Sequence, residues 1–130
     1  ELILIAPAFN MMDLRAAQIS TERRERWQAT GSMPWDDEPM HKDAPIPWHW
    51  VEDSQALWQR RLQQPRRVKT TILHGLQDTV IRPAGSWAFV QQVLSQDPEF
   101  PIDLLLTTGD HRLSSLDHLE TVRRLVLRDR

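Results

Sequence analysis

The chain has 130 residues, which suits one small domain, and its net charge is −2 with a pI near 6.2. Its 16 basic and 18 acidic side chains nearly balance, so there is no electrostatic case for nucleic acid or an anionic membrane as a partner. There is no Cys, which excludes disulfides, thiolate metal sites and Cys nucleophiles, and no apolar run approaches the roughly 20 residues that cross a bilayer. The redox compartment stays open, and the cytoplasm is only the default location.

The N-terminal part of the chain predicts one strand followed by a helix. Residues 2–6 form a continuous apolar run that a proline closes, which is typical of a strand buried on both faces in a parallel sheet. A short surface helix is predicted over residues 19–29, with Ser20 or Thr21 as its N-cap and Gly31 just after its C-terminal end.

The middle of the chain predicts a loop and a second helix. Residues 31–47 hold four of the nine prolines and show no periodicity, so an ordered but irregular loop is expected there. Helical spacing returns over residues 48–62. The buried positions of this helix are predicted to be Val51, Leu57, Trp58 and Leu62.

The last 65 residues alternate strands with helices. A β-rich run over residues 68–74 ends at a glycine, and a helix is predicted behind Pro83. A second apolar run, residues 102–107, precedes a last helix that Ser114 or Ser115 caps. This alternation indicates βαβ units, so the sequence predicts an α/β fold with three parallel strands, the first of which comes from the N-terminus.

Two of the loops that follow predicted strands hold groups suited to catalysis. Asp78 stands four residues past His74 at one strand end, and His111 follows the next strand after Gly109. Such loops converge on one crevice, so Asp78 and His111 are expected within hydrogen-bond distance, as in the back half of a nucleophilic hydrolase site. The alternatives are a turn role for Asp78 and a solvated ring for His111. His74 is expected to pack or to bond the backbone, and Asp110 to hydrogen-bond within its loop.

These motifs resemble the α/β-hydrolase family, in which a strand ending in His-Gly-x-x-Asp-x-x-Val carries the triad acid and a later Gly-Asp-His carries the base. Both motifs occur here in that order, with Ile81 at the position of the first motif's Val, and Asp78 and His111 are 33 residues apart. The closer resemblance is to small capped serine hydrolases related to the mitochondrial palmitoyl-protein thioesterase and acyl-glucuronide esterase, and to their bacterial counterparts. It covers nearly the whole chain. The matching stretches are residues 2–6, 22–34, 74–80 and 110–112.

The resemblance implies that the chain is the C-terminal part of an α/β-hydrolase domain. Residues 10–64 would form a helical cap insertion, and residues 65–130 would bear the acid and the base. The implied activity is hydrolysis of carboxylic esters or acyl thioesters by a Ser-His-Asp mechanism, with Asp78 as the acid, His111 as the base and no metal or organic cofactor. The implied partner is a small-molecule acyl ester or thioester.

The family's Gly-x-Ser-x-Gly elbow is absent from the sequence, and neither Ser32 nor Ser86 lies between a buried strand and a core helix. The nucleophile is therefore expected outside this chain, which would make the chain a fragment that is inactive by itself. The strand at residues 2–6 would then be an exposed edge, covered either by a missing N-terminal portion or by self-association. The alternatives are a non-catalytic binding or assembly module of the same fold and a hydrolase with an Asp nucleophile.

Large apolar side chains are concentrated in the first half, where five of the six Trp precede residue 60. Such side chains either hold an irregular loop together or line an acyl pocket, and the sequence does not separate these roles. The candidates for substrate contact are Phe9, Trp27, Trp35 and Trp48. Three further residues could be taken for metal ligands, but their spacing matches no known signature, so no metal site is predicted. They are His41, Asp43 and His49.

Overall fold

The computed structural model describes residues 1–34, 45–63 and 66–127. They divide into two compact units, one within Glu1–Phe9 and Pro65–Arg130 and the other within Asn10–Gln64. The chain thus leaves the first unit after a single strand and returns to it near residue 66. Three residues singled out in the sequence lie outside the described residues. They are Trp35, His41 and Asp43.

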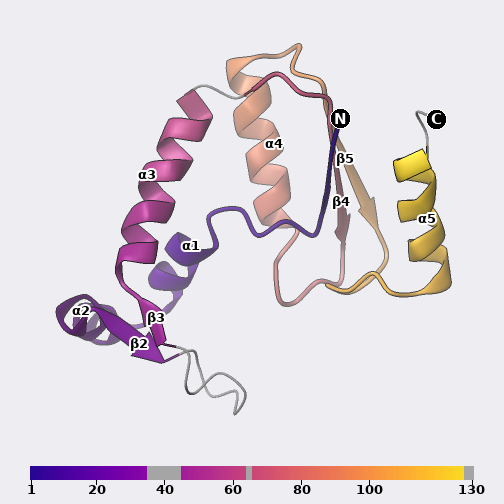
Figure 1. Cartoon of the computed structure of the whole chain (residues 1–130). Helices are drawn as coiled ribbons and strands as arrows, with labels where there is room; N and C mark the ends of the chain where they lie inside the picture. The colour runs from indigo at the N-terminus through magenta and orange to yellow at the C-terminus, as the bar shows by residue number, and fades with distance from the viewer. Residues whose placement is uncertain (35–44, 64–65, 128–130) are drawn as a thin grey trace. The chain divides into compact units, whose positions relative to one another are not determined.

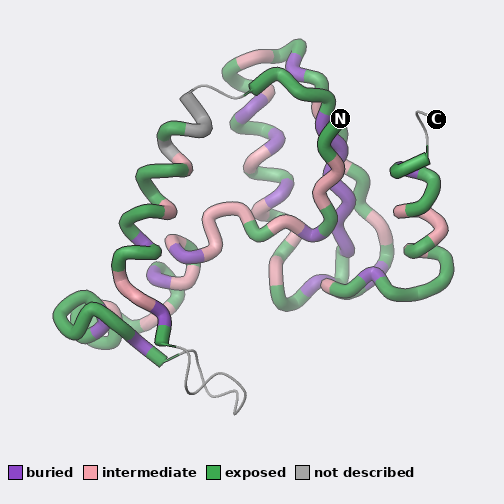
Figure 2. The backbone as a smooth tube through the Cα atoms, in the orientation of Figure 1, coloured by how far each residue is buried: buried purple, intermediate pink, exposed green. Residues whose placement is uncertain are grey.

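The first unit is built on a parallel sheet of three strands, β1 (Leu2–Ile5), β4 (Thr70–Gly75) and β5 (Ile102–Thr107), in the order β1-β4-β5 (Figure 1). The register pairs Leu2 with Thr70 and Thr70 with Ile102. All six residues of β4 are buried (Figure 2), because it bonds a neighbour on both edges. The predicted α/β fold with three parallel strands is confirmed.

Helices α4 (Ala84–Gln96) and α5 (Leu116–Leu127) flank this sheet on opposite sides (Figure 1). Helix α4 follows Pro83, as predicted, and buries Val90 and Val93. Helix α5 is capped by Ser115, whose hydroxyl accepts a hydrogen bond of 3.3 Å from the backbone N–H of His118. One core cluster joins the sheet to α5 and consists of Leu73, Leu113 and Leu125, with Ile3 and Val122 against it.

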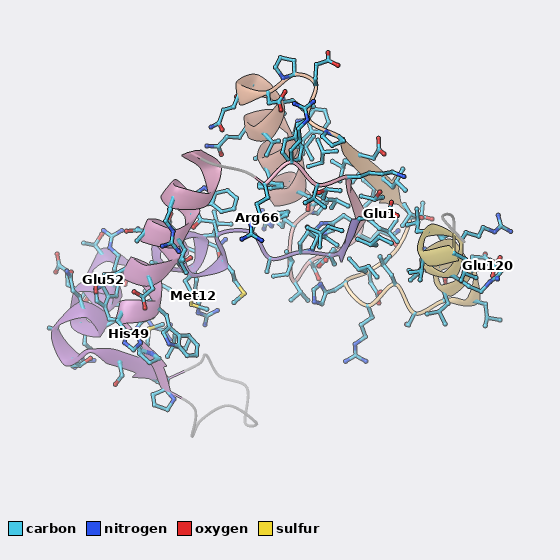
Figure 3. All side chains as sticks on the ribbon, turned by 45° about the horizontal axis from the view of Figure 1, so that its top comes forward. Glu1, Met12, His49, Glu52, Arg66 and Glu120 are labelled. Atoms are coloured by element: carbon cyan, nitrogen blue, oxygen red, sulfur yellow. The ribbon has the colours of Figure 1, made fainter. Side chains whose placement is uncertain are left out.

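The acidic and basic side chains of α5 pair along its surface. Glu120 accepts hydrogen bonds from the guanidinium groups of Arg123 and Arg124, which lower the pKa of Glu120 to about 2. Figure 3 shows Glu120 on the side of α5 that faces away from the sheet. These ion pairs are therefore solvent-exposed, and salt screens them.

The second unit contains α1 (Met11–Gln18), α2 (Thr21–Thr30), β2 (Ser32–Pro34), β3 (Pro45–Pro47) and α3 (His49–Gln63). Strands β2 and β3 pair in antiparallel fashion. Ser20 caps α2 by accepting from the N–H of Arg23, and Gly31 ends it with a left-handed φ of 73°. The core of this unit is formed by Met12, Ala16, Trp27, Met33, Ile46 and Val51. Met12 lies beside α3 in Figure 3.

The second unit differs from the sequence prediction in three places. The irregular loop predicted over residues 31–47 is wrong at both ends, where the chain forms β2 and β3. The prolines of these strands are tolerated because an isolated pair of strands has outer edges that need no ladder N–H. Helix α1 was not predicted. Leu57 of α3, predicted to be buried, is 48% exposed.

Candidate active site

The candidate site lies at the carboxyl ends of β4 and β5, where two loops bond to each other through their backbones. The N–H of Leu76 donates to the carbonyl of Thr107 (2.8 Å), and the N–H of Gln77 donates to the carbonyl of Gly109 (2.9 Å). Parallel strands that end side by side present both loops at one edge of the sheet. The loop after β4 and the loop after β5 therefore act as one scaffold.

Asp78 lies in the loop after β4, and both of its carboxylate oxygens are engaged. Oδ1 accepts hydrogen bonds from the N–H groups of Val80 (2.9 Å) and Ile81 (2.7 Å). Oδ2 lies 2.8 Å from Nδ1 of His111. The Asp78 side chain is fully buried, so these bonds fix its orientation.

The surroundings of Asp78 favour its ionised form. Burial by itself would raise the pKa of this carboxyl, but the hydrogen bonds from His111, Ile81 and Val80 outweigh burial and hold the pKa below its ordinary value. The ionised carboxylate therefore stabilises the folded state at pH values above the ordinary carboxyl pKa. That contribution is lost as the pH falls through the lowered pKa of the folded state.

His111 lies in the loop after β5 with its side chain 39% exposed. The turn that carries it is held by Asp110, whose Oδ1 accepts from the N–H groups of Arg112 (3.0 Å) and Leu113 (3.1 Å). Nδ1 faces Asp78, and no hydrogen bond reaches Nε2 from any described residue. The ring thus has one nitrogen held by a buried carboxylate and the other available for proton transfer. Asp110 has the loop role predicted for it.

A second histidine contacts the same carboxylate from the buried side. Nε2 of His74, the fifth residue of β4, lies 3.2 Å from Oδ2 of Asp78 and 2.8 Å from the carbonyl oxygen of Ile81. Nδ1 of His74 lies 2.8 Å from the hydroxyl of Ser86 in α4, and both side chains are fully buried. Sequence reasoning predicted packing or backbone bonding for His74 but missed its contacts with Asp78 and Ser86. The one available signal was the spacing of Ser86 from Val90 and Val93, which places it on the buried face of α4.

Three of the residues predicted to contact substrate lie in the described part of the chain, namely Phe9, Trp27 and Trp48. Phe9 stacks on Phe89 of α4, with ring centroids 4.1 Å apart and planes 16° apart. Trp27 is 1% exposed and donates from Nε1 to the carbonyl of Ile46 (2.8 Å). Trp48 packs edge-on against Trp27, with centroids 5.2 Å apart. Trp27 and Trp48 therefore hold the second unit together, and substrate contact for any of them stays a prediction.

Metal clusters and membrane-spanning helices are both absent from residues 1–34, 45–63 and 66–127. In that part of the chain, no three His, Asp or Glu side chains come together in a way that could hold a metal ion. None of the described helices is long and apolar enough to cross a membrane.

The parallel sheet and its flanking helices form an α/β fold, with the Asp78–His111 pair at the strand ends. Two solved structures share this fold. Alpha/beta hydrolase domain-containing protein 10 from mouse is 21% identical, with a TM-score of 0.64 over 96% of this chain and 51% of that chain. The "Putative hydrolase" from Agrobacterium vitis S4 is 22% identical, with a TM-score of 0.67 over 95% of this chain and 47% of that one.

The present chain thus spans about half the length of these two solved structures. No family model matches the sequence, and no curated protein matches it significantly. At these identities the likeness defines the fold, so the activity has to be argued from the site.

Proposed function

We propose that the protein is a serine hydrolase that cleaves carboxylic esters or acyl thioesters through an acyl-enzyme. The observation that supports this most directly is the 2.8 Å bond between Oδ2 of the buried Asp78 and Nδ1 of His111. It orients the ring so that Nε2 points away from the carboxylate. An Asp-held imidazole with a free Nε2 is the acid–base half of a catalytic triad.

In the proposed reaction, His111 Nε2 takes the proton from a serine hydroxyl as that oxygen attacks the acyl carbon, and then gives the proton to the leaving group. Asp78 keeps the proton of the neutral ring on Nδ1 and stabilises the imidazolium that forms. We assign the serine and the oxyanion hole to residues outside this chain, because the sequence contains no Gly-x-Ser-x-Gly elbow. No step in this sequence requires a metal or an organic cofactor.

The proposed substrate is a small acyl ester or thioester, and the unit within Asn10–Gln64 is proposed as the cap that excludes water from the acyl group. This unit has an apolar core in which Trp27 packs against Trp48, which suits a rigid wall for an acyl pocket. The resemblance to small capped esterases and thioesterases supports this assignment, and the low net charge of the chain fits a small, weakly charged substrate.

The test uses the full-length protein and an activated acyl ester. His111→Ala removes the base, and Asp78→Asn places an amide N–H2 against the Nδ1–H of His111, because the amide oxygen is needed for the N–H groups of Val80 and Ile81. Each change is expected to lower kcat by roughly 10⁴-fold. A fluorophosphonate probe should label the wild-type protein stoichiometrically and both variants far more slowly.

Asp110→Asn is the matched control, since its Oδ1 also accepts two backbone N–H groups but makes no bond to His111. It should retain near wild-type turnover. Wild-type turnover by Asp78→Asn would contradict the proposal. Absence of labelling in the wild-type protein would point to a binding module, and incorporation of ¹⁸O from water into an Asp side chain during turnover would identify an Asp nucleophile.

A further inference from the structure

On the buried side of Asp78 lies a series of hydrogen-bonded side chains that the proposed mechanism does not use. It runs from Ser86 in the first turn of α4 through His74 of β4 to Asp78 and Ile81 in the loop after β4. All three side chains in it are fully buried. Both ring nitrogens of the buried His74 thus have hydrogen-bond partners, as buried polar groups normally do.

The hydrogen-bond partners determine which ring nitrogen of His74 carries the proton. The carbonyl oxygen of Ile81, 2.8 Å from Nε2, can only accept, and the ionised Oδ2 of Asp78, 3.2 Å away, can also only accept. Nε2 is therefore the donor. Nδ1 is then the acceptor in a neutral ring, and the hydroxyl of Ser86, 2.8 Å away, must donate to it.

The sequence of groups Ser86, His74 and Asp78 has the composition of a triad, but its geometry rules out that role. Ser86 and His74 are both 0% exposed, so no substrate carbonyl can reach the hydroxyl. These groups can hold a loop in place but cannot attack a substrate.

We propose that Ser86 and His74 are positioning residues. The Nε2–H of His74 holds the Asp78 carboxylate and the Ile81 carbonyl where His111 needs them, and the Ser86 hydroxyl holds the ring by donating to Nδ1. This inference rests on the proposed function. Without the Ser86 donor, the buried Nδ1 has no hydrogen-bond partner, and the ring loses the contact that keeps Nε2–H directed at the two oxygens. The loop would move away from the ring, and the Asp78–His111 bond would loosen.

The first test reads the tautomer directly and does not depend on activity. The full-length protein is labelled with ¹⁵N-histidine, and the ring nitrogens of His74 are assigned by their loss in a His74→Gln sample. The expected spectrum shows a protonated Nε2 and a bare Nδ1. A ring protonated on Nδ1, whether alone or together with Nε2, would overturn the proposal, since Ser86 would then accept instead of donating.

The second test separates positioning from bulk stability. Ser86→Ala is expected to lower kcat by roughly 10-fold to 100-fold with KM changed less than twofold, because a small displacement of a catalytic group slows the chemistry and not the binding. His74→Gln keeps a side-chain N–H donor and should retain more turnover than His74→Leu. Ser95→Ala is the matched control, since this exposed Ser of the same helix bonds only to the carbonyl of Gln92.

The outcomes distinguish this inference from the proposed function. If the wild-type protein hydrolyses esters but Ser86→Ala keeps the wild-type kcat, the positioning role is wrong and the hydrolase assignment stands. If the wild-type protein hydrolyses nothing, the assignment falls, and the nitrogen spectrum still decides whether Ser86 donates to His74. If Ser86→Ala does not fold, the wild-type spectrum alone supports or overturns the tautomer.

Discussion

At the scale of single residues, the loops after β4 and β5 can approach each other because Gly75 has no side chain. A Cβ atom added at this position would meet the carbonyl oxygens of Gly109 and Asp110, the latter at 2.6 Å. Both are backbone atoms of the loop that carries His111, so neither can turn aside. The final residue of β4 therefore has to be Gly for the two loops to form their backbone bonds.

We predict that Gly75→Ala separates the loops and lowers the free energy of unfolding by about 1–3 kcal/mol, as overpacking against a fixed neighbour does. Activity should fall further than this loss of stability explains, because the Asp78–His111 distance grows. Gly85→Ala is the control, since a Cβ there meets nothing within 4 Å. It should be neutral or stabilising by about 0.4–1 kcal/mol. Urea unfolding measures the free energy of unfolding of both variants. An equal change for Gly75→Ala and Gly85→Ala would contradict the role given to Gly75.

Sequence reasoning could predict that Asp78 and His111 meet but not the side chains behind them. Asp78 and His111 each follow an apolar run, and the ends of parallel strands meet, so their bond could be expected from spacing alone. Ser86 lies 12 positions from His74, on a helix whose rotation about its axis depends on packing in three dimensions. The spacing of Ser86 from Val90 and Val93 places it on the buried face of α4, but not beside His74.

At the scale of elements, prediction was best where one apolar run or one cap residue decided the outcome. Strand β5 was predicted at residues 102–107 and is found at Ile102–Thr107, and the Ser20 and Gly31 ends of α2 follow cap chemistry. Strands β2 and β3 have three residues each, too few to show alternation, and they exist because they pair with each other. Pairing between segments is tertiary information that local pattern lacks.

Trp27 connects two of these elements, because its Nε1–H donates from α2 to the carbonyl of Ile46 in β3. We predict that Trp27→Phe destabilises the second unit by about 1–3 kcal/mol, since a buried carbonyl loses its donor. Trp50→Phe is the control, as Trp50 is 47% exposed. Thermal melting of the full-length variants provides the comparison. Equal melting temperatures would mean that Trp27 contributes no structural bond and would revive a role in substrate contact.

At the scale of the whole molecule, β1 has an open edge. In the part of the chain that the structure describes, β1 pairs only with β4, and Leu2 and Ile5 are 44% and 45% exposed. An apolar strand with an unpaired edge is a template for another strand. The open edge is thus the feature of the first unit most suited to association.

We predict that the 130-residue chain, expressed by itself, associates through β1 and does not react with a fluorophosphonate probe. The double change Leu2→Lys and Ile5→Lys should reduce the associated fraction, because charged side chains block edge pairing. Leu14→Lys, at a 49% exposed position of α1, controls for added charge. Sedimentation velocity measures the species present. A sharply melting monomer, or stoichiometric labelling, would contradict the prediction.

The hydrogen bonds that hold Asp78 and His111 in place bear on how such a protein can change over evolution. Every hydrogen bond described around the pair comes from residues 74–113, which form one β-loop-α-β-loop segment of the first unit. The unit within Asn10–Gln64 could therefore be lengthened, shortened or exchanged between relatives without removing any of these bonds. Substrate range and catalytic chemistry would then diversify independently.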